Sequence, residues 1–154
     1  MAVSFGAQAL TYRDLDNIAN RLAHRLIGHG AGPGTNVALV SGRSASAVTA
    51  MLAILKSGAA YLAVDPALPD ERIRFMLADT PPVVVLTAAA QRHRLTGMSA
   101  TVLDIDDPAP DQPATAPPPP RSDDIAYVIY TSGTTGTPKA VAVTHANLAH
   151  IADS

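Results

Sequence analysis

The sequence predicts an α/β domain in which strands and helices alternate around a largely parallel β-sheet. Short unbroken apolar runs, typical of strands covered on both faces, alternate along the chain with segments whose apolar residues recur at helical spacing. The chain has 154 residues, 47% hydrophobic and 16% charged, so it is long and apolar enough to form a core of its own. Such alternation favours parallel strand pairing through right-handed crossovers.

Capping signals mark the helices among the predicted elements. The elements are expected in this order: a helix over 11–28, a strand over 36–40, a helix over 48–58, a strand over 60–64, a helix from 69, a strand over 83–86, a short helix after 87, and strands over 101–105 and 125–131. The first helix begins with Thr11 and Asp14, which have the spacing of a capping box. The second ends at Gly58, which suits a C-cap, and the third opens at Pro69, because proline suits the first helical turn.

Four strands are predicted from the runs NVALV, AYLAV, VVVL and TVLDI, which are too short for helices. Residues 106–122 interrupt the alternation, because they hold seven of the thirteen prolines. This composition predicts an extended, polyproline-like linker or surface loop. The chain is therefore divided into an α/β portion over 1–105, a proline-rich segment over 106–122, and a strand pair with the start of a further helix over 123–154.

Charge and composition limit the partners and the compartment. The net charge is −2, from 11 basic and 13 acidic residues, so no strong field attracts nucleic acid or an anionic membrane. The absence of cysteine excludes disulfides, thiolate metal sites and cysteine nucleophiles, and fits a reducing compartment. The first residues lack the pattern of a signal peptide, and no apolar run approaches the about 18 residues that span a bilayer. We expect a cytoplasmic protein that binds neither nucleic acid nor membrane.

The stretch TSGTTGTPK, residues 131–139, is the candidate site for a polyphosphate. Several negative charges close together require inward-facing N–H groups, small hydroxyl donors and a cation. Gly133 and Gly136 permit close approach of the backbone, Thr131, Ser132, Thr134, Thr135 and Thr137 carry hydroxyls, and Lys139, one of only two lysines, carries the charge. The alternative interpretation is a glycine- and threonine-rich hairpin without a ligand.

This stretch differs from the Walker phosphate loop, in which glycine and lysine are adjacent and a helix follows. Here Thr137 and Pro138 separate Gly136 from Lys139, and the next residues, AVAVTH, have the apolar continuity of a strand. We therefore expect a turn between two strands, where the lysine and the hydroxyls rather than a helix dipole hold the phosphates.

Other polar residues favour structural roles. The five histidines are His24, His29, His93, His145 and His150. None of them forms an HExxH motif, and the last two do not have the spacing of a metal pair on one helical face. Ser132 is not in a G-x-S-x-G motif, and Asp65, before Pro66 at a strand end, suits a turn cap. No metal site and no complete catalytic set is expected in this chain.

The stretch YVIYTSGTTGTPKAVAVTHANL, residues 127–148, closely resembles the phosphate-loop signature of the adenylate-forming enzymes. This superfamily includes acyl-CoA synthetases, luciferases and the adenylation domains of nonribosomal peptide synthetases. LTYRDLDNIANRLAHRL, at 10–26, resembles its first core motif. LKSGAAYLAVDPALPDERIRFMLADTPPVVVLT, at 55–87, resembles its second in the form typical of peptide synthetases. The resemblance covers most of the chain outside the proline-rich segment.

The resemblance implies a reaction in two steps. A carboxylate attacks the α-phosphate of ATP and releases pyrophosphate, and the acyl-adenylate is then passed to a thiol, which in peptide synthetases is the phosphopantetheine of a carrier domain. By this resemblance residues 131–139 hold the β- and γ-phosphates. The ligands implied are ATP with Mg²⁺ and a small carboxylate, most simply an amino acid, and the fold implied is the amino-terminal portion of the large domain.

The family's magnesium-binding acid, ribose-binding aspartate, substrate pocket and carboxy-terminal lysine are expected beyond Ser154. The chain is therefore interpreted as an amino-terminal fragment of an adenylation domain, inactive alone. Two alternatives stay open: a fragment of an acyl-CoA or aryl-acid ligase, and a non-catalytic remnant that binds nucleotide or serves as an interaction surface.

One position departs from the family pattern, because alanine stands at 140 where the family usually has glycine after the lysine. A backbone that required positive φ there would strain Ala140 by about 1 kcal/mol. On that condition we predict weaker ATP binding than in a glycine form.

Overall fold

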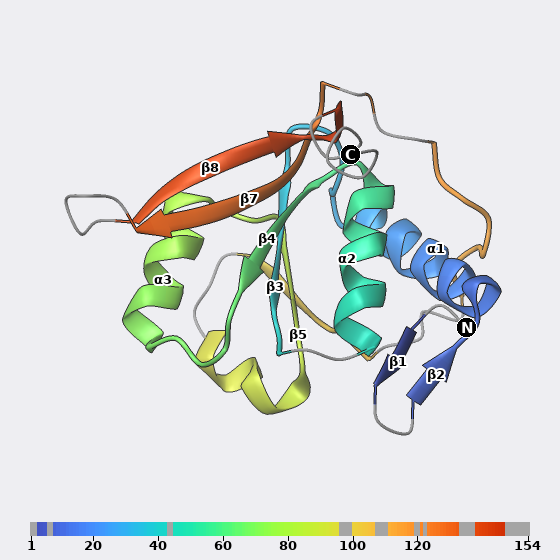
Figure 1. Cartoon of the computed structure of the whole chain (residues 1–154), viewed down its shortest axis with the longest axis horizontal. Coiled ribbons are helices and arrows are strands. Elements are labelled where there is room, and N and C mark those ends of the chain that lie inside the picture. The colour runs from blue at the N-terminus through green and yellow to red at the C-terminus, as the bar shows by residue number, and fades with distance from the viewer. Residues whose placement is uncertain are drawn as a thin grey trace.

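A six-stranded sheet with helices on both faces forms the body of the protein in a computed structural model (Figure 1). The structure describes residues 3–5, 8–42, 45–95, 100–106, 111–118, 121, 123–132 and 138–146; at 3–5, 8–10, 45, 131–132 and 138–139 it describes the backbone alone. The strands of the sheet are β3 (Asn36–Val40), β4 (Ala60–Val64), β5 (Val84–Thr87), β6 (Thr101–Asp104), β7 (Ile125–Ser132) and β8 (Pro138–Thr144).

The strand order is β6-β5-β3-β4-β7-β8, and every neighbouring pair is parallel except β7 and β8, which are antiparallel. The predicted fold class, an α/β unit with a mostly parallel sheet that ends in a strand–loop–strand element, is confirmed. The predicted strand over 36–40 and that over 60–64 have the observed bounds, and that over 83–86 is displaced by one residue.

Two hydrophobic clusters fill the two faces of the sheet. Helices α1 (Tyr12–Gly28) and α2 (Ala45–Ser57) cover one face, and α3 (Asp70–Asp79) with the 3-10 helix η1 (Ala89–Leu95) covers the other. In β3, Val37 and Leu39 belong to the α1–α2 side, whereas Ala38 and Val40 belong to the α3 side. The strand is therefore apolar at consecutive positions because both of its faces are buried.

Local signals explain where the helices begin and end. The amide of Asp14 donates to Thr11 Oγ1 over 3.0 Å and the amide of Thr11 donates back to Asp14 Oδ2 over 3.4 Å, which confirms the capping box. Pro69 stands at the N-cap of α3, one position before the helix proper. Gly58 follows α2 with φ +88°, a conformation that favours glycine, and a Cβ there would make a tight contact of 3.0 Å with the Pro33 ring.

A small antiparallel pair, β1 (Val3–Phe5) with β2 (Gln8–Leu10), precedes α1. No pattern in the sequence predicts this pair. Strands of three residues are too short for an alternation pattern to stand out, and their pairing depends on the chain that surrounds them.

The described part of the proline-rich segment is fastened to α1. The side-chain amide of Asn20 donates to the carbonyl of Ala114 over 2.8 Å, and His24 Nε2 lies 2.8 Å from the carbonyl of Thr115. Pro117 is buried. Residues 111–118 therefore form a strap along the helix, although their composition is that of a linker.

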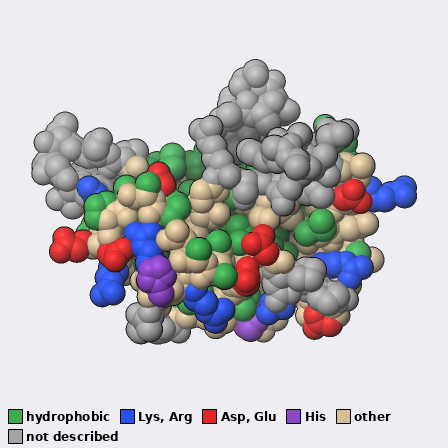
Figure 2. Space-filling model, turned by 90° about the horizontal axis from the view of Figure 1, so that it is seen from below, with side chains coloured by type: hydrophobic (Ala, Val, Ile, Leu, Met, Phe, Trp, Pro, Cys, Tyr) green, Lys and Arg blue, Asp and Glu red, His purple; other side chains and the backbone are tan. Residues whose placement is uncertain are grey.

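The surface shows no separation of charge on the face seen in Figure 2, where acidic and basic side chains are interspersed among apolar ones. This fits the net charge of −2. Within the part of the chain that the structure describes, no helix has both the length and the apolar character needed to cross a bilayer.

Candidate functional site

The β7–β8 hairpin carries the predicted phosphate-binding stretch. Its two strands pair over seven register positions, and the last two pairs join Thr131 to Lys139 and Ser132 to Pro138. The prediction that a strand rather than a helix follows the loop is confirmed. The structure thus brings the two ends of the stretch together on neighbouring strands. Of the other predicted residues, Gly133, Thr134, Thr135, Gly136 and Thr137 lie outside the described residues.

The hairpin leaves the sheet at the carboxyl edge of the parallel strands. β7 pairs with β4 only at Tyr61–Tyr127 and Leu62–Val128, so residues 129–132 continue past these pairs with β8 as their described strand partner. Figure 1 shows the outer ends of both strands next to α3. Ligands of open α/β sheets bind at the carboxyl ends of the strands, so this is a suitable position for a binding element.

Tyr130 joins the outer part of the hairpin to the end of α3. Its hydroxyl lies 2.5 Å from Thr80 Oγ1 and 2.9 Å from Asp79 Oδ2, and the Met76 carbonyl is 3.3 Å away. Burial raises the pKa of Tyr130, and the Asp79 carboxylate reinforces this whereas the bond with Thr80 opposes it. The phenol is therefore protonated at neutral pH and can donate to Asp79 while Thr80 donates to it.

The contact of Tyr130 with Asp79 and Thr80 was not predicted from the sequence. The two partners of Tyr130 stand 50 and 51 residues earlier in the chain, in a different element. No periodic or motif signal relates them, and their proximity results from the fold alone.

Ala140 lies in β8 as the register partner of Tyr130, and its side chain is exposed. Residues of an antiparallel ladder have extended backbone with negative φ, which alanine adopts readily. The condition on which strain was predicted at Ala140 is therefore not met, and weaker ATP binding is not expected from this cause.

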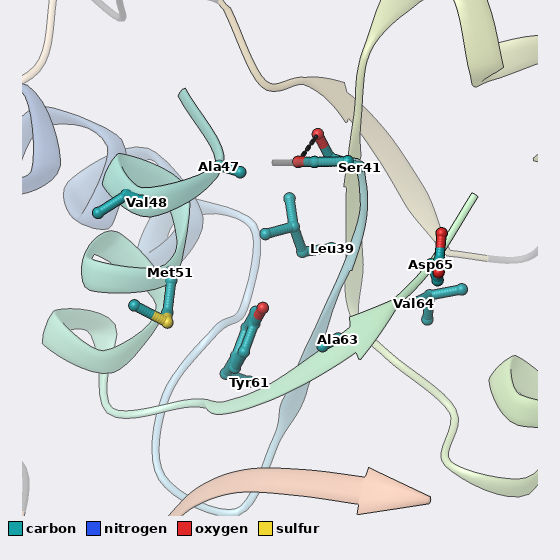
Figure 3. A pocket seen from close by; sticks show the side chains of 10 residues that line it. Leu39, Ser41, Ala47, Val48, Met51, Tyr61, Ala63, Val64 and Asp65 are labelled. Atoms are coloured by element: carbon teal, nitrogen blue, oxygen red, sulfur yellow. Dashed lines mark hydrogen bonds between the residues drawn. The ribbon is translucent and has the colours of Figure 1, made fainter. Parts of the chain in front are cut away.

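A separate cavity of about 360 Å³ lies between α2 and the ends of β3 and β4 (Figure 3). Its walls are mainly apolar, with Leu39, Met51 and Tyr61 among the lining residues. The two polar side chains at its rim have partners in their own loops: Ser41 Oγ donates to the Gly42 carbonyl over 3.2 Å, and Asp65 Oδ1 accepts from the Ala67 amide over 2.9 Å. Among the described residues that line the cavity, Asp65 is the one carboxylate and none is a histidine. The predicted turn-cap role of Asp65 is confirmed.

The histidines have separate surroundings. His24 contacts the proline-rich strap, His29 is the C-cap of α1, and the amide of His145 donates to the Asp124 carbonyl over 2.9 Å. His150 lies outside the described residues. Among the residues that the structure describes, no three histidine, aspartate or glutamate side chains are grouped to hold a metal ion.

Comparison with known proteins identifies the family. The family described as "AMP-binding enzyme" matches residues 1–154. The isonitrile lipopeptide synthase of Mycobacterium tuberculosis (strain ATCC 25618 / H37Rv) is 51% identical over 150 residues, which are 97% of this chain and 6% of that protein. Surfactin synthase subunit 3 of Bacillus subtilis (strain 168) is 46% identical over 154 residues, covering 96% of this chain and 12% of the relative. The chain therefore spans a small part of the curated relatives it matches.

Solved structures agree with this assignment. The nonribosomal peptide synthetase FmoA3 in its AMPPNP-bound form superposes with a TM-score of 0.87 at 33% identity, over 96% of this chain and 16% of that one. ATP-bound MatB from Rhodopseudomonas palustris superposes with a TM-score of 0.84 at 27% identity, over 94% of this chain and 31% of that one.

Proposed function

The chain belongs to the AMP-binding enzyme family, and from this premise we propose that it is the part of an adenylation domain that holds the β- and γ-phosphates of ATP while an amino acid is activated. The observation that carries the proposal is the pairing of Thr131 with Lys139 at the two ends of TSGTTGTPK. The relatives named as lipopeptide and surfactin synthases support an amino acid as the carboxylate.

In the proposed reaction a carboxylate oxygen attacks the α-phosphorus of ATP. The bond from that phosphorus to the oxygen bridging to the β-phosphate breaks, and the oxygen keeps the bonding electrons and leaves with pyrophosphate. Negative charge therefore builds on the β- and γ-phosphates as the bond breaks. The hydroxyls and amides of residues 131–137 and the ammonium of Lys139 are assigned to this charge, because preorganised donors lower the barrier where charge develops.

Mg²⁺ is expected to accompany the triphosphate and to neutralise part of its charge. The described residues include no group of three histidine, aspartate or glutamate side chains for a metal. We assign residues 131–139 to the phosphates. The acceptor of the acyl-adenylate is proposed to be the phosphopantetheine thiol of a carrier domain.

The test of this function uses Lys139→Gln in the full-length protein that contains the chain, assayed by amino-acid-dependent ATP–pyrophosphate exchange. Glutamine keeps a hydrogen-bond donor on a slightly shorter side chain but removes the charge. Loss of a charge-assisted contact predicts a fall in kcat/KM for ATP of about tenfold to a hundredfold. An unchanged kcat/KM would contradict the proposal.

The other lysine supplies a matched control. Lys56 Nζ lies 2.8 Å from Asp16 Oδ1 on the α1–α2 side of the molecule, remote in the fold from the hairpin. Lys56→Gln is expected to leave exchange within about twofold of the parent, as surface substitutions usually do. Pyrophosphate exchange that depends on acyl or aryl acids instead of amino acids would favour an acyl-CoA or aryl-acid ligase. Absence of exchange with every carboxylate tested would favour a non-catalytic role.

A further inference from the structure

The outer half of the β7–β8 hairpin has one described side-chain attachment to α3, through Tyr130. Beyond Val128, the strand β7 loses β4 as a partner. Strand pairing to β8 alone leaves a two-stranded ribbon, which is free to twist and bend unless something else holds it. The position of the backbone at Lys139 therefore depends on contacts outside the sheet.

The Tyr130 ring provides such a contact on the α3 side. The ring packs against the hydrophobic cluster beneath α3, to which Ile73, Met76 and Leu77 belong. Its hydroxyl lies 2.9 Å from Oδ2 of Asp79, the last residue of α3, and 2.5 Å from Oγ1 of Thr80, the C-cap of that helix. One aromatic side chain thus binds the ribbon to the end of a helix through both its apolar body and its polar tip.

The register carries this attachment to the phosphate-binding stretch. Tyr130 is paired with Ala140, and the next pair outward is Thr131 with Lys139. Neighbouring positions of a ladder move together, so fixing the Tyr130–Ala140 pair also restrains the backbone of the Thr131–Lys139 pair.

We propose that the Tyr130 hydroxyl, held by Asp79 and Thr80, is a positioning group that sets Lys139 for the ATP phosphates. This inference rests on the proposed function. Tyr130 acts through the backbone pair next to it and does not itself contact the nucleotide. Its removal should therefore weaken ATP binding while leaving recognition of the carboxylate unaffected.

Tyr130→Phe in the full-length protein tests the proposal, since phenylalanine keeps the packing of the ring and removes the hydroxyl alone. We expect KM for ATP in pyrophosphate exchange to rise about threefold to tenfold, which is the size of the net contribution of one ordinary intramolecular hydrogen bond. KM for the amino acid should stay within about twofold. Amides at 129–132 and 138–141 should exchange hydrogen faster.

Tyr127→Phe is the matched control. Tyr127 lies in the same strand, is partly buried, and pairs with Tyr61 and Val143 on the inner part of the hairpin. Removal of this hydroxyl should leave KM for ATP and amide exchange at 129–132 unchanged. An equal effect of both tyrosine substitutions would overturn the positioning role, because a general loss of strand stability would then account for it.

A double-substitution cycle with Asp79→Ala examines the coupling directly. If Tyr130 acts through Asp79, the variant that carries both Tyr130→Phe and Asp79→Ala should raise KM for ATP no more than the larger single effect. Effects that multiply would overturn the proposed link between the two residues. An unchanged KM in Tyr130→Phe together with a raised KM in Lys139→Gln would overturn the positioning role alone. Unchanged values in both would overturn the proposed function and this inference with it.

Discussion

Ala140 shows how a residue's role depends on the backbone conformation at its position. A substitution of glycine by alanine is costly where φ is positive and harmless or stabilising in a strand. Ala140 pairs with Tyr130 in a strand, so alanine at this position carries no cost from positive φ. The departure from the family pattern at this position is therefore compatible with an intact hairpin.

We expect Ala140→Gly to leave KM for ATP within about twofold of the parent. Glycine in a strand interior loses more conformational freedom on folding, so the free energy of unfolding should fall by about 0.5–1 kcal/mol. Pyrophosphate exchange and urea unfolding of the same two proteins measure the two effects. A clear gain in ATP affinity would mean that the backbone at 140 leaves the strand conformation when nucleotide binds.

At the scale of elements, α1 is stabilised at its start by side chains and along its length by the rest of the fold. The capping box satisfies two backbone groups that the first turn would otherwise leave unpaired. Further along, Asn20 and His24 hold the strap at 111–118, so the helix also fixes a segment whose composition would not fold by itself. Helix α1 therefore contributes to the hydrophobic core and also holds the proline-rich segment in place.

Thr11→Ala should lower the free energy of unfolding by about 1 kcal/mol, because the Asp14 amide loses its acceptor. Thr11→Ser keeps the hydroxyl and is the control, with a loss of at most a few tenths of a kcal/mol expected. Urea unfolding followed by far-ultraviolet circular dichroism measures both variants. Equal destabilisation by alanine and serine would contradict the capping role.

At the scale of the whole molecule, the sheet is covered unevenly. The α1–α2 pair covers the strands at its centre, but the same face of β7 and β8 carries Ile129 and Val141 at 44% and 43% exposure. These two residues are register partners, so their side chains form one apolar surface. Exposed contiguous apolar surface on a sheet edge favours association.

The chain by itself should therefore associate as its concentration rises, and the double substitution Ile129→Thr with Val141→Thr should reduce this association. Threonine keeps the β-branched shape that strands favour while removing apolar surface. Light scattering over a concentration series measures the effect. Phe75→Gln, at a position on α3 that is 40% exposed, is the control and should change little. Equal scattering by the double variant and the parent would assign association to another surface.

The predictions from sequence succeeded where a local cause is sufficient. The start of α1 at Thr11 and the end of α2 before Gly58 were predictable, because capping and positive φ depend on a few neighbouring atoms. Strands buried on both faces were predictable from continuous apolar runs, and the stretch 131–139 from its donors and its lysine. The assignment of that stretch to ATP phosphates stays a prediction.

Tertiary structure decided what depends on residues far apart in the chain. The attachment of Tyr130 to Asp79 and Thr80 and the fastening of the proline-rich strap to α1 both follow from which surfaces the folded chain brings together. The amino-acid sequence by itself determined the elements and the chemical groups available, because propensity, capping and charge are local properties. The fold determined which of those groups meet, because contacts across 50 residues or more have no local signature.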